Sequence, residues 1–236
     1  MTSSNVHQPD GKDHPPNLTR PKVVASQVWK EATEFIDSLV YPPGFELFRQ
    51  DSPAQVVFFS KTGLVKLMRS EDNGRELILS LKFSGSLFGA AAVIHDKPQP
   101  FSAVTVTSCK LARLRAQEFL DLVSADTQLA SSLHEMLSAE ILNQTARISQ
   151  IACLPARHRL EQLLWQLACD WSADSGKPDL KFQLPLRYWE VAQLLAITPT
   201  YLSRLFRELE RDGVISRSKG WIFIRKPADL WHAVGT

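Results

Sequence analysis

The pattern of apolar and polar positions changes its period along the chain. Between Tyr41 and Arg115, short apolar runs alternate with turn signals such as Lys61-Thr62-Gly63 and Ser84-Gly85, a spacing typical of β-strands. On either side of this segment apolar residues recur every three or four positions, which indicates helices. The pattern therefore predicts an α+β protein that begins with a jelly-roll β-sandwich and continues in helices.

The predicted elements of the first part are one helix and six strands. An amphipathic helix is expected from Val28 to Leu39, with Val28, Phe35, Ile36 and Leu39 facing inward. The strand-like runs are Phe45 to Arg49, Val56 to Phe59, Leu64 to Met68, Leu77 to Leu81, Ser102 to Val106 and Leu111 to Leu114.

Helical periodicity returns after Arg115, with a short helix from Ala116 to Val123 and a long one from Thr127 to Leu154. At 1.5 Å per residue the long helix would span about 42 Å, more than a small domain needs. It carries a stripe close to a coiled-coil repeat, formed by Leu133, Leu137, Ile141, Gln144, Ile148 and Ile151. The stripe could pack on its own β-sandwich, but we expect it to form a homodimer. Pro155 ends the helix, and another is expected from His158 to Trp171, followed by a polar loop from Ser172 to Asp179.

Two shorter helices are predicted between Arg187 and Asp212. Tyr188, Val191, Ala192 and Leu195 give the first an apolar face. Thr198 is a suitable N-cap for the second, and Pro199 suits its first position because it lacks an N–H. On that helix Leu202, Leu205, Phe206 and Leu209 share one face, while polar and basic side chains occupy the other.

This arrangement is typical of a helix-turn-helix, whose second helix reads base edges in the major groove. An ordinary helical hairpin with a solvated charged face would give a similar pattern. Two β-rich runs around Ser218-Lys219-Gly220 favour a winged helix-turn-helix, and residues 187–226 hold eight Lys and Arg against four Asp and Glu. The candidate DNA-binding residues are Thr198, Thr200, Tyr201, Ser203, Arg204, Arg207, Arg217 and Lys219.

Length and composition allow two domains within the 236 residues, of which 44% are hydrophobic. We expect a disordered tail at 1–20, a β-roll sensor domain at 21–126, a dimerisation helix at 127–154 and a DNA-binding domain at 155–236. No run approaches a membrane span and no secretory signal is evident, so a cytoplasmic protein is expected. Three dispersed cysteines predict neither a disulfide framework nor a structural zinc site.

Local sequence adds a family resemblance over much of the chain. Four segments are similar to strands and turns in the sensor domain of one protein family: Tyr41 to Gln50, Gly63 to Leu67, Gly74 to Leu79 and Gly85 to Gly89. A fifth segment, Thr198 to Leu205, is similar to the recognition helix of the same family. The chain thus resembles the cyclic-AMP receptor protein and fumarate–nitrate regulator (Crp–Fnr) family of bacterial transcription regulators. The resemblance implies a cyclic-nucleotide-binding-like fold, double-stranded DNA and RNA polymerase as partners, no catalysis, and a guanine contact by Arg204.

Departures from the family pattern concern the effector. Where cyclic-AMP-binding members carry Glu and Arg, this chain has Ala90 and Phe101, so control by cyclic AMP is not expected. The tail also lacks the cysteines of iron–sulfur members. We expect a mostly apolar effector pocket at Leu87, Phe88, Ala90, Ala91, Phe101, Ser102, Gln144 and Thr145. The alternative is that these residues simply fill the core. A haem sensor using His95 or Cys109 is an alternative, whereas a cupin-like enzyme is disfavoured because His95 is the only histidine between Tyr41 and Arg115.

Overall fold

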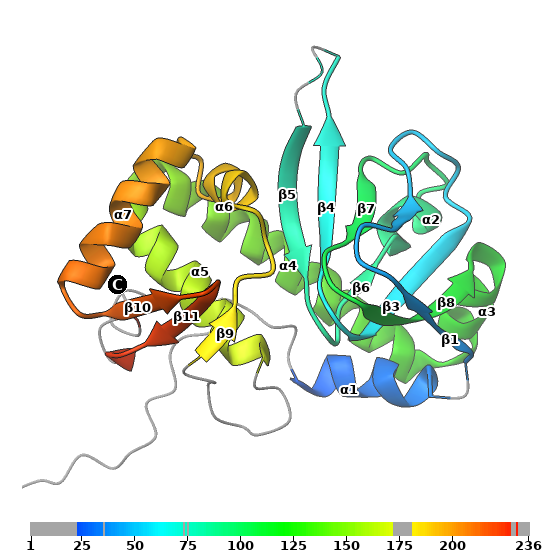
Figure 1. Cartoon of the computed structure of the whole chain (residues 1–236). Helices are drawn as coiled ribbons and strands as arrows, with labels where there is room; N and C mark the ends of the chain where they lie inside the picture. The colour runs from blue at the N-terminus through cyan, green and yellow to red at the C-terminus, as the bar shows by residue number, and fades with distance from the viewer. Residues whose placement is uncertain are drawn as a thin grey trace, which may run out of the picture.

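The computed structural model describes residues 23–34, 36–72, 74, 76–171, 181–227 and 230. Figure 1 shows a β-sandwich on one side and a small helical unit with its own sheet on the other, while helix α4 (Thr127–Cys153) runs behind the strands. The tail expected at 1–20 and the polar loop expected from Ser172 to Asp179 lie outside the described residues. The predicted fold of jelly-roll sandwich, long helix and winged helix-turn-helix is confirmed.

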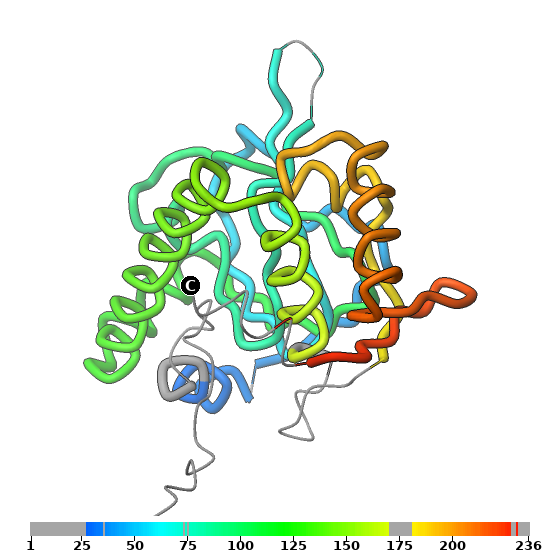
Figure 2. The backbone as a smooth tube through the Cα atoms, turned by 90° about the vertical axis from the view of Figure 1, so that its left-hand side faces the viewer, coloured from blue at the N-terminus to red at the C-terminus, as the bar shows by residue number. Residues whose placement is uncertain are grey.

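The sandwich, called the β-roll below, consists of two antiparallel four-stranded sheets within the described residues. Their strand orders are β1-β8-β3-β6 and β2-β7-β4-β5. The bounds are β1 (Ser38–Tyr41), β2 (Glu46–Phe48), β3 (Val56–Thr62), β4 (Val65–Ser70), β5 (Glu76–Lys82), β6 (Leu87–Phe88), β7 (Ser102–Thr105) and β8 (Cys109–Arg115). The β4–β5 hairpin projects beyond the rest of the roll in Figures 1 and 2.

The two sheets enclose an aromatic and aliphatic core. Phe58 on β3 and Phe88 on β6 stack with ring centroids 5.6 Å apart, and Phe48 on β2 closes against both from the facing sheet. Phe58 and Phe88 are almost fully buried. Because a fully buried large apolar side chain contributes about 1.5–3 kcal/mol, these rings fix the sandwich strongly.

The first helix differs from its prediction. Helix α1 spans Val23–Ala32, and the segment from Ser38 to Tyr41 instead forms edge strand β1, paired with β8. Helix α1 packs on the rest of the protein through the fully buried Trp29, which stacks on Phe119 of α3 (Ala116–Ala125). The predicted inward position of Leu39 is wrong: its side chain is 52% exposed on the edge strand. Pairing with a strand distant in sequence overrides the local helical spacing.

Strand β6 and the short helix α2 (Ala90–Ile94) were not predicted from the sequence, because neither is long enough to show a period. Gly89 joins them with a φ of 88°, and a Cβ at this position would lie 2.8 Å from the carbonyl oxygen of Val56. Glycine is therefore required at this turn.

Helix α4 begins at the predicted residue. The Asp126 carboxylate caps it by accepting the N–H groups of Gln128 and Leu129, and the helix ends before Pro155. Its first half packs on the β-roll, since Leu129, Leu133 and other side chains there belong to the core that contains Trp29. Its second half leaves large apolar side chains exposed.

The winged helix unit follows α5 (Ala156–Trp171) and consists of α6 (Tyr188–Leu194), α7 (Pro199–Arg211), β10 (Ile215–Ser218) and β11 (Trp221–Ile224), with β9 (Lys181–Gln183) at one edge. The two helices and the hairpin were predicted, but β9 was not. It pairs with β11 over only three residues, so it carries little sequence signal.

Helix α6 contacts the β-roll directly. Lys66 on β4 forms an ion pair with Glu190 on α6, and the side chains are 13% and 6% exposed. Gln193 on α6 donates to the carbonyl oxygen of Glu76 at 2.8 Å. Glu190 also accepts the N–H of Arg187 and so completes the N-terminal capping box of α6. One carboxylate thus stabilises both the helix and its contact with the β-roll.

Candidate nucleic-acid interface and effector cavity

The two faces of α7 have opposite character, as predicted. Leu202, Leu205, Phe206 and Leu209 are at most 1% exposed, whereas Thr200, Tyr201, Arg204 and Arg207 are exposed. The Thr198 hydroxyl accepts the N–H of Tyr201, and Pro199 occupies the first turn. In Figure 1 α7 lies on the side of the molecule that faces away from the β-roll.

The turn between α6 and α7 is short and fixed. Ala196 has a φ of 50°, in the left-handed region, and Ile197 donates its N–H to the carbonyl of Ala192. A non-glycine residue in this region costs free energy, which the packing of the two helices must offset. The geometry holds α7 at a defined angle to α6, as a helix-turn-helix requires.

The polar side chains of α7 differ in their availability. Arg204 has an exposed side chain (74%), and its Nε donates to Glu208 one turn later at 3.0 Å. Such exposed ion pairs contribute little, so the guanidinium can leave Glu208 for a base edge. The Ser203 hydroxyl instead donates to the carbonyl of Pro199 at 3.1 Å. Arg204 is therefore the better placed of the two for base recognition.

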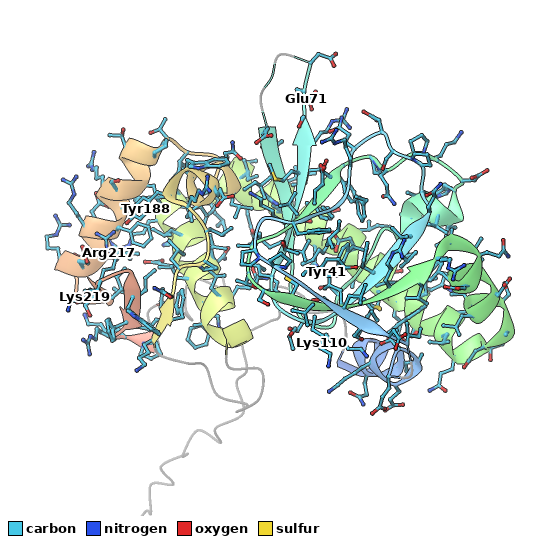
Figure 3. The ribbon with its side chains drawn as sticks, turned by 45° about the vertical axis from the view of Figure 1, so that its right-hand side comes forward. Tyr41, Glu71, Lys110, Tyr188, Arg217 and Lys219 are labelled. Carbon is cyan, nitrogen blue, oxygen red and sulfur yellow. The ribbon has the colours of Figure 1, made fainter. Side chains whose placement is uncertain are left out.

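Arg217 of the wing was expected to contact DNA, but its guanidinium is bound by side chains of its own chain. Its guanidinium donates twice to Glu210, at 2.9 and 2.8 Å, also donates to the Tyr188 hydroxyl, and lies 4.6 Å from the centroid of the Phe206 ring. Figure 3 shows Tyr188 and Arg217 side by side. Hydrogen bonding to Glu210 raises the pKa of Arg217. Arg217 thus attaches the wing to α7, whereas Lys219 at the exposed tip remains free to meet phosphate.

The predicted dimer stripe on α4 is only partly exposed. Leu133 is 4% exposed and packs in the core of its own β-roll, and Leu137 packs against the same core. Leu133 is thus buried within its own protomer and Leu137 is partly buried there, because the first half of α4 covers the β-roll. Ile141 and Ile148, by contrast, are 67% and 70% exposed. Gln144 lines the cavity described in the next paragraph, and Ile151, near the C-terminal end of α4, is 40% exposed.

A cavity of about 550 Å³ lies between the β-roll, α4, α5 and the C-terminal end of α6. It is lined by six of the eight residues predicted for an effector pocket: Leu87, Phe88, Ala90, Ala91, Phe101 and Gln144. Ser102 and Thr145 do not line it. The Ser102 hydroxyl accepts the N–H of Gln50, and Thr145 lies on the exposed face of α4, where its hydroxyl donates to the carbonyl of Ile141.

The cavity is less uniformly apolar than predicted. Lys82 on β5 and Glu140 on α4 form an ion pair of 2.6 Å in its wall. Burial opposes ionisation of Glu140, but the Lys82 ammonium and a hydrogen bond from Gln144 outweigh it and lower the pKa of the carboxyl. Arg147 and Arg159 line the end nearest α6. None of these four charged residues was singled out in the sequence, although Glu140 and Arg147 flank Gln144 at helical spacing on α4.

The two residues considered as haem ligands lie away from this cavity. The Cys109 thiol is fully buried in the β-roll and donates to the carbonyls of Leu64 and Thr107 at 3.3 Å. Burial raises the pKa of the thiol. His95 is exposed at the end of α2. Neither belongs to the described cavity lining, so the structure gives no support to a haem bound there.

Comparisons with known proteins agree with both parts of the chain. Residues 38–126 match the family model for a cyclic nucleotide-binding domain, and residues 158–233 match that for a Crp-like helix-turn-helix domain. The "Cyclic AMP receptor protein" of Thermus thermophilus is 25% identical over 84% of this chain and 88% of its own length. The "CRP-like protein Clp" of Xanthomonas euvesicatoria is 26% identical over 74% of this chain and 78% of its own. No helix in the described part of the chain is long and apolar enough to cross a membrane.

Solved structures show the same fold. FixK2 from Bradyrhizobium japonicum has a TM-score of 0.73 at 19% identity and covers 85% of this chain and 98% of that one. The c-di-GMP responsive global regulator CLP from Xanthomonas campestris has a TM-score of 0.67 at 23% identity, covering 85% and 99%. The relatives are transcription regulators, not enzymes. This chain belongs to the Crp–Fnr family and is a Crp-like transcription regulator with a helix-turn-helix DNA-binding domain.

Proposed function

We propose that this regulator acts as a two-fold symmetric dimer that reads a near-palindromic DNA site. The observation that carries the proposal is the pairing of two exposed features: the polar face of α7, and the apolar side chains Ile141, Leu142 and Ile148 on α4, which are 65–70% exposed. Large apolar side chains gathered on one exposed helix are typical of an interaction surface. A two-fold axis along α4 would present both recognition helices to one face of DNA.

The geometry of a dimeric helix-turn-helix defines the site. Two recognition helices reach successive major grooves when they lie about one turn, roughly 34 Å, apart, so the half-sites repeat with inverted symmetry. Arg204 would contact a guanine in each half-site through its O6 and N7 atoms. Thr200 and Ser203 would contact a thymine methyl or phosphate, and Lys219 a phosphate. RNA polymerase would then be the partner at promoters.

Cyclic AMP is not expected to be the effector. A buried phosphate needs a cation or several hydrogen-bond donors, because an uncompensated buried charge costs several kcal/mol. Removing one partner of a buried ion pair, for example, costs about 3–5 kcal/mol. Ala90 is 3% exposed and offers no acceptor, and Phe101 packs beside Phe48 with ring centroids 6.2 Å apart. The cavity wall at these two positions is apolar, so the polar contacts that the family pattern makes there with cyclic AMP are absent. Calorimetric titration with cyclic AMP should show no micromolar binding, and binding that also tightens DNA affinity would refute this part of the proposal.

Selection from a library of random DNA duplexes tests the proposal as a whole. We expect an enriched motif with two inverted half-sites spaced by about one helical turn. The Thr200→Ala and Arg204→Ala variants should change the bases enriched within each half-site and leave the spacing unchanged. Enrichment of a single unpaired half-site, or of no motif, would contradict the proposal.

A further inference from the structure

The end of the cavity nearest α6 contains two partly buried arginines that the proposed function does not use. Arg147 on α4 donates to the carbonyl oxygens of Ile78 and Leu79 on β5 and, at 3.4 Å, to that of Leu194 on α6. Arg159 on α5 donates to the carbonyls of Leu154, at 2.6 Å, and Leu195, at 2.8 Å. Both side chains line the cavity. Their partners are backbone carbonyls rather than carboxylates.

The charges of the cavity wall do not balance. Among the described residues that line it, the cations are Lys82, Arg147 and Arg159 and the only carboxylate is Glu140. Lys82 and Glu140 neutralise each other at 2.6 Å, which leaves the two arginines. The C-terminal ends of α4 and α6, which the arginines contact, each provide about half a negative charge. Roughly one positive charge thus remains uncompensated in a partly buried place, and burial lowers the pKa of Arg147.

The opposite end of the cavity is apolar. It is formed by Phe88 and Phe101 from the β-roll and by Leu133 and Met136 from α4. Met136 and Arg147 are eleven residues apart on one helix, which corresponds to about 16 Å along its axis. The cavity is therefore elongated, with an apolar end between the sheets and α4 and a cationic end beside α6.

We propose that this cavity binds an amphipathic monoanion: an elongated apolar molecule with one carboxylate, which Arg147 and Arg159 hold. One negative charge matches the uncompensated charge, and the apolar body occupies the end at Phe88 and Phe101. This inference takes the cavity as the effector site, and it rests on the proposed function only for DNA affinity as the readout of occupancy. It places the anionic group at the α6 end rather than at Ala90 and Phe101, where the family pattern has its polar residues.

The position of the arginines links such a ligand to DNA binding. Arg147 and Arg159 contact the last carbonyls of α6, the helix that positions the recognition helix, and the same residues would hold the carboxylate. A ligand that draws the guanidinium groups toward itself changes the contact between α6 and the β-roll. The affinity for DNA should change with occupancy, because a ligand shifts an equilibrium by its differential affinity for the two states.

Decanoate and decan-1-ol are the probes for the test, because they share a ten-carbon chain and differ in charge. Calorimetric titration of the full-length protein should show roughly 10- to 150-fold tighter binding of decanoate, the ratio expected from a charged hydrogen bond of about 1.5–3 kcal/mol. Equal affinities, or tighter binding of the alcohol, would overturn the proposal.

Variants separate the charge from the structural role of the arginine. R147Q should abolish the preference for decanoate, while R147K, which keeps the charge, should retain it. If R147Q does not fold, A139F gives an independent answer, since Ala139 lines the cavity and a larger side chain should weaken both probes. Unchanged binding of both probes to A139F would place them elsewhere and overturn the proposal.

Duplex selections with and without decanoate distinguish the two proposals. An inverted-repeat motif together with failure to bind decanoate would refute the ligand class and leave the proposed function intact. Binding of decanoate with the expected dependence on Arg147, together with no enriched motif in either selection, would refute the proposed function alone. When both hold, saturating decanoate should change the affinity for the selected duplex in the wild type and much less in R147Q.

Discussion

Substitution of Ile141 by Asp should separate the two protomers without unfolding either. The Ile141 side chain is 67% exposed in the single chain, so its replacement should leave the core of the β-roll intact. Full burial of an isoleucine side chain contributes about 1.5–3 kcal/mol, so burial of the exposed two thirds should contribute roughly 1–2 kcal/mol per protomer. The dimer contains the residue twice, so its loss should cost roughly 2–4 kcal/mol.

This cost corresponds to a rise of roughly 30- to 700-fold in the dissociation constant of the dimer. Two carboxylates in the seam would add to the effect, because burying a charge without a partner is unfavourable. Sedimentation velocity over a dilution series measures the constant directly. Leu39→Asp is a matched control, since Leu39 is also an exposed apolar residue (52%) but lies on β1.

The control should retain the wild-type dimer, and both variants should retain the wild-type midpoint of urea unfolding when measured as monomers. An unchanged dissociation constant for Ile141→Asp would refute dimerisation through this exposed face of α4. A similar weakening by Leu39→Asp would show that the interface includes the β-roll edge instead.

Three further predictions follow from individual contacts. Leu133→Ala should lower the free energy of unfolding by about 2–5 kcal/mol in urea titrations, because it leaves a hole in the core of the β-roll; a loss below about 1 kcal/mol would contradict that packing. Lys219→Ala should weaken binding to every duplex alike and reduce the slope of log affinity against log salt concentration by about one. Arg217→Ala should instead lower the stability of the fold, because Glu210 loses its partner. A lower salt slope with unchanged stability for Arg217→Ala would show that Arg217 contacts phosphate. Glu190→Gln should lower the free energy of unfolding, because it leaves Lys66 buried without a counter-charge. Replacing Lys66 by Met in the same chain should recover most of this free energy in urea titrations. No recovery would show that the ion pair is not the cause.

Local signals account for the parts that the sequence predicted well. Thr198 and Pro199 locate the start of α7 because capping depends only on neighbouring backbone N–H groups. The two-residue turn at Lys219 and Gly220 has φ values of 49° and 82°, which matches the hairpin that the β-rich runs predicted. These features need no knowledge of the rest of the molecule.

Residues whose environment depends on distant segments were predicted poorly. The spacing of Leu133 on α4 is the same as that of an exposed stripe, and only the position of the β-roll decides that it is buried. Leu39 has helical spacing but pairs with β8. Arg147 gave no signal because its partners are backbone carbonyls 68 and 69 residues earlier and 47 residues later, and a carbonyl carries no residue identity.

The measurement that tests the central claim most directly is the ratio of specific to non-specific DNA affinity for Arg204→Ala, at one fixed salt concentration. The duplexes are the selected site and a scrambled sequence of the same composition. We expect the variant to lose roughly 1–3 kcal/mol of discrimination at one base pair in each half-site, while its affinity for the scrambled duplex falls only slightly. A ratio equal to that of the wild type would contradict sequence reading by α7.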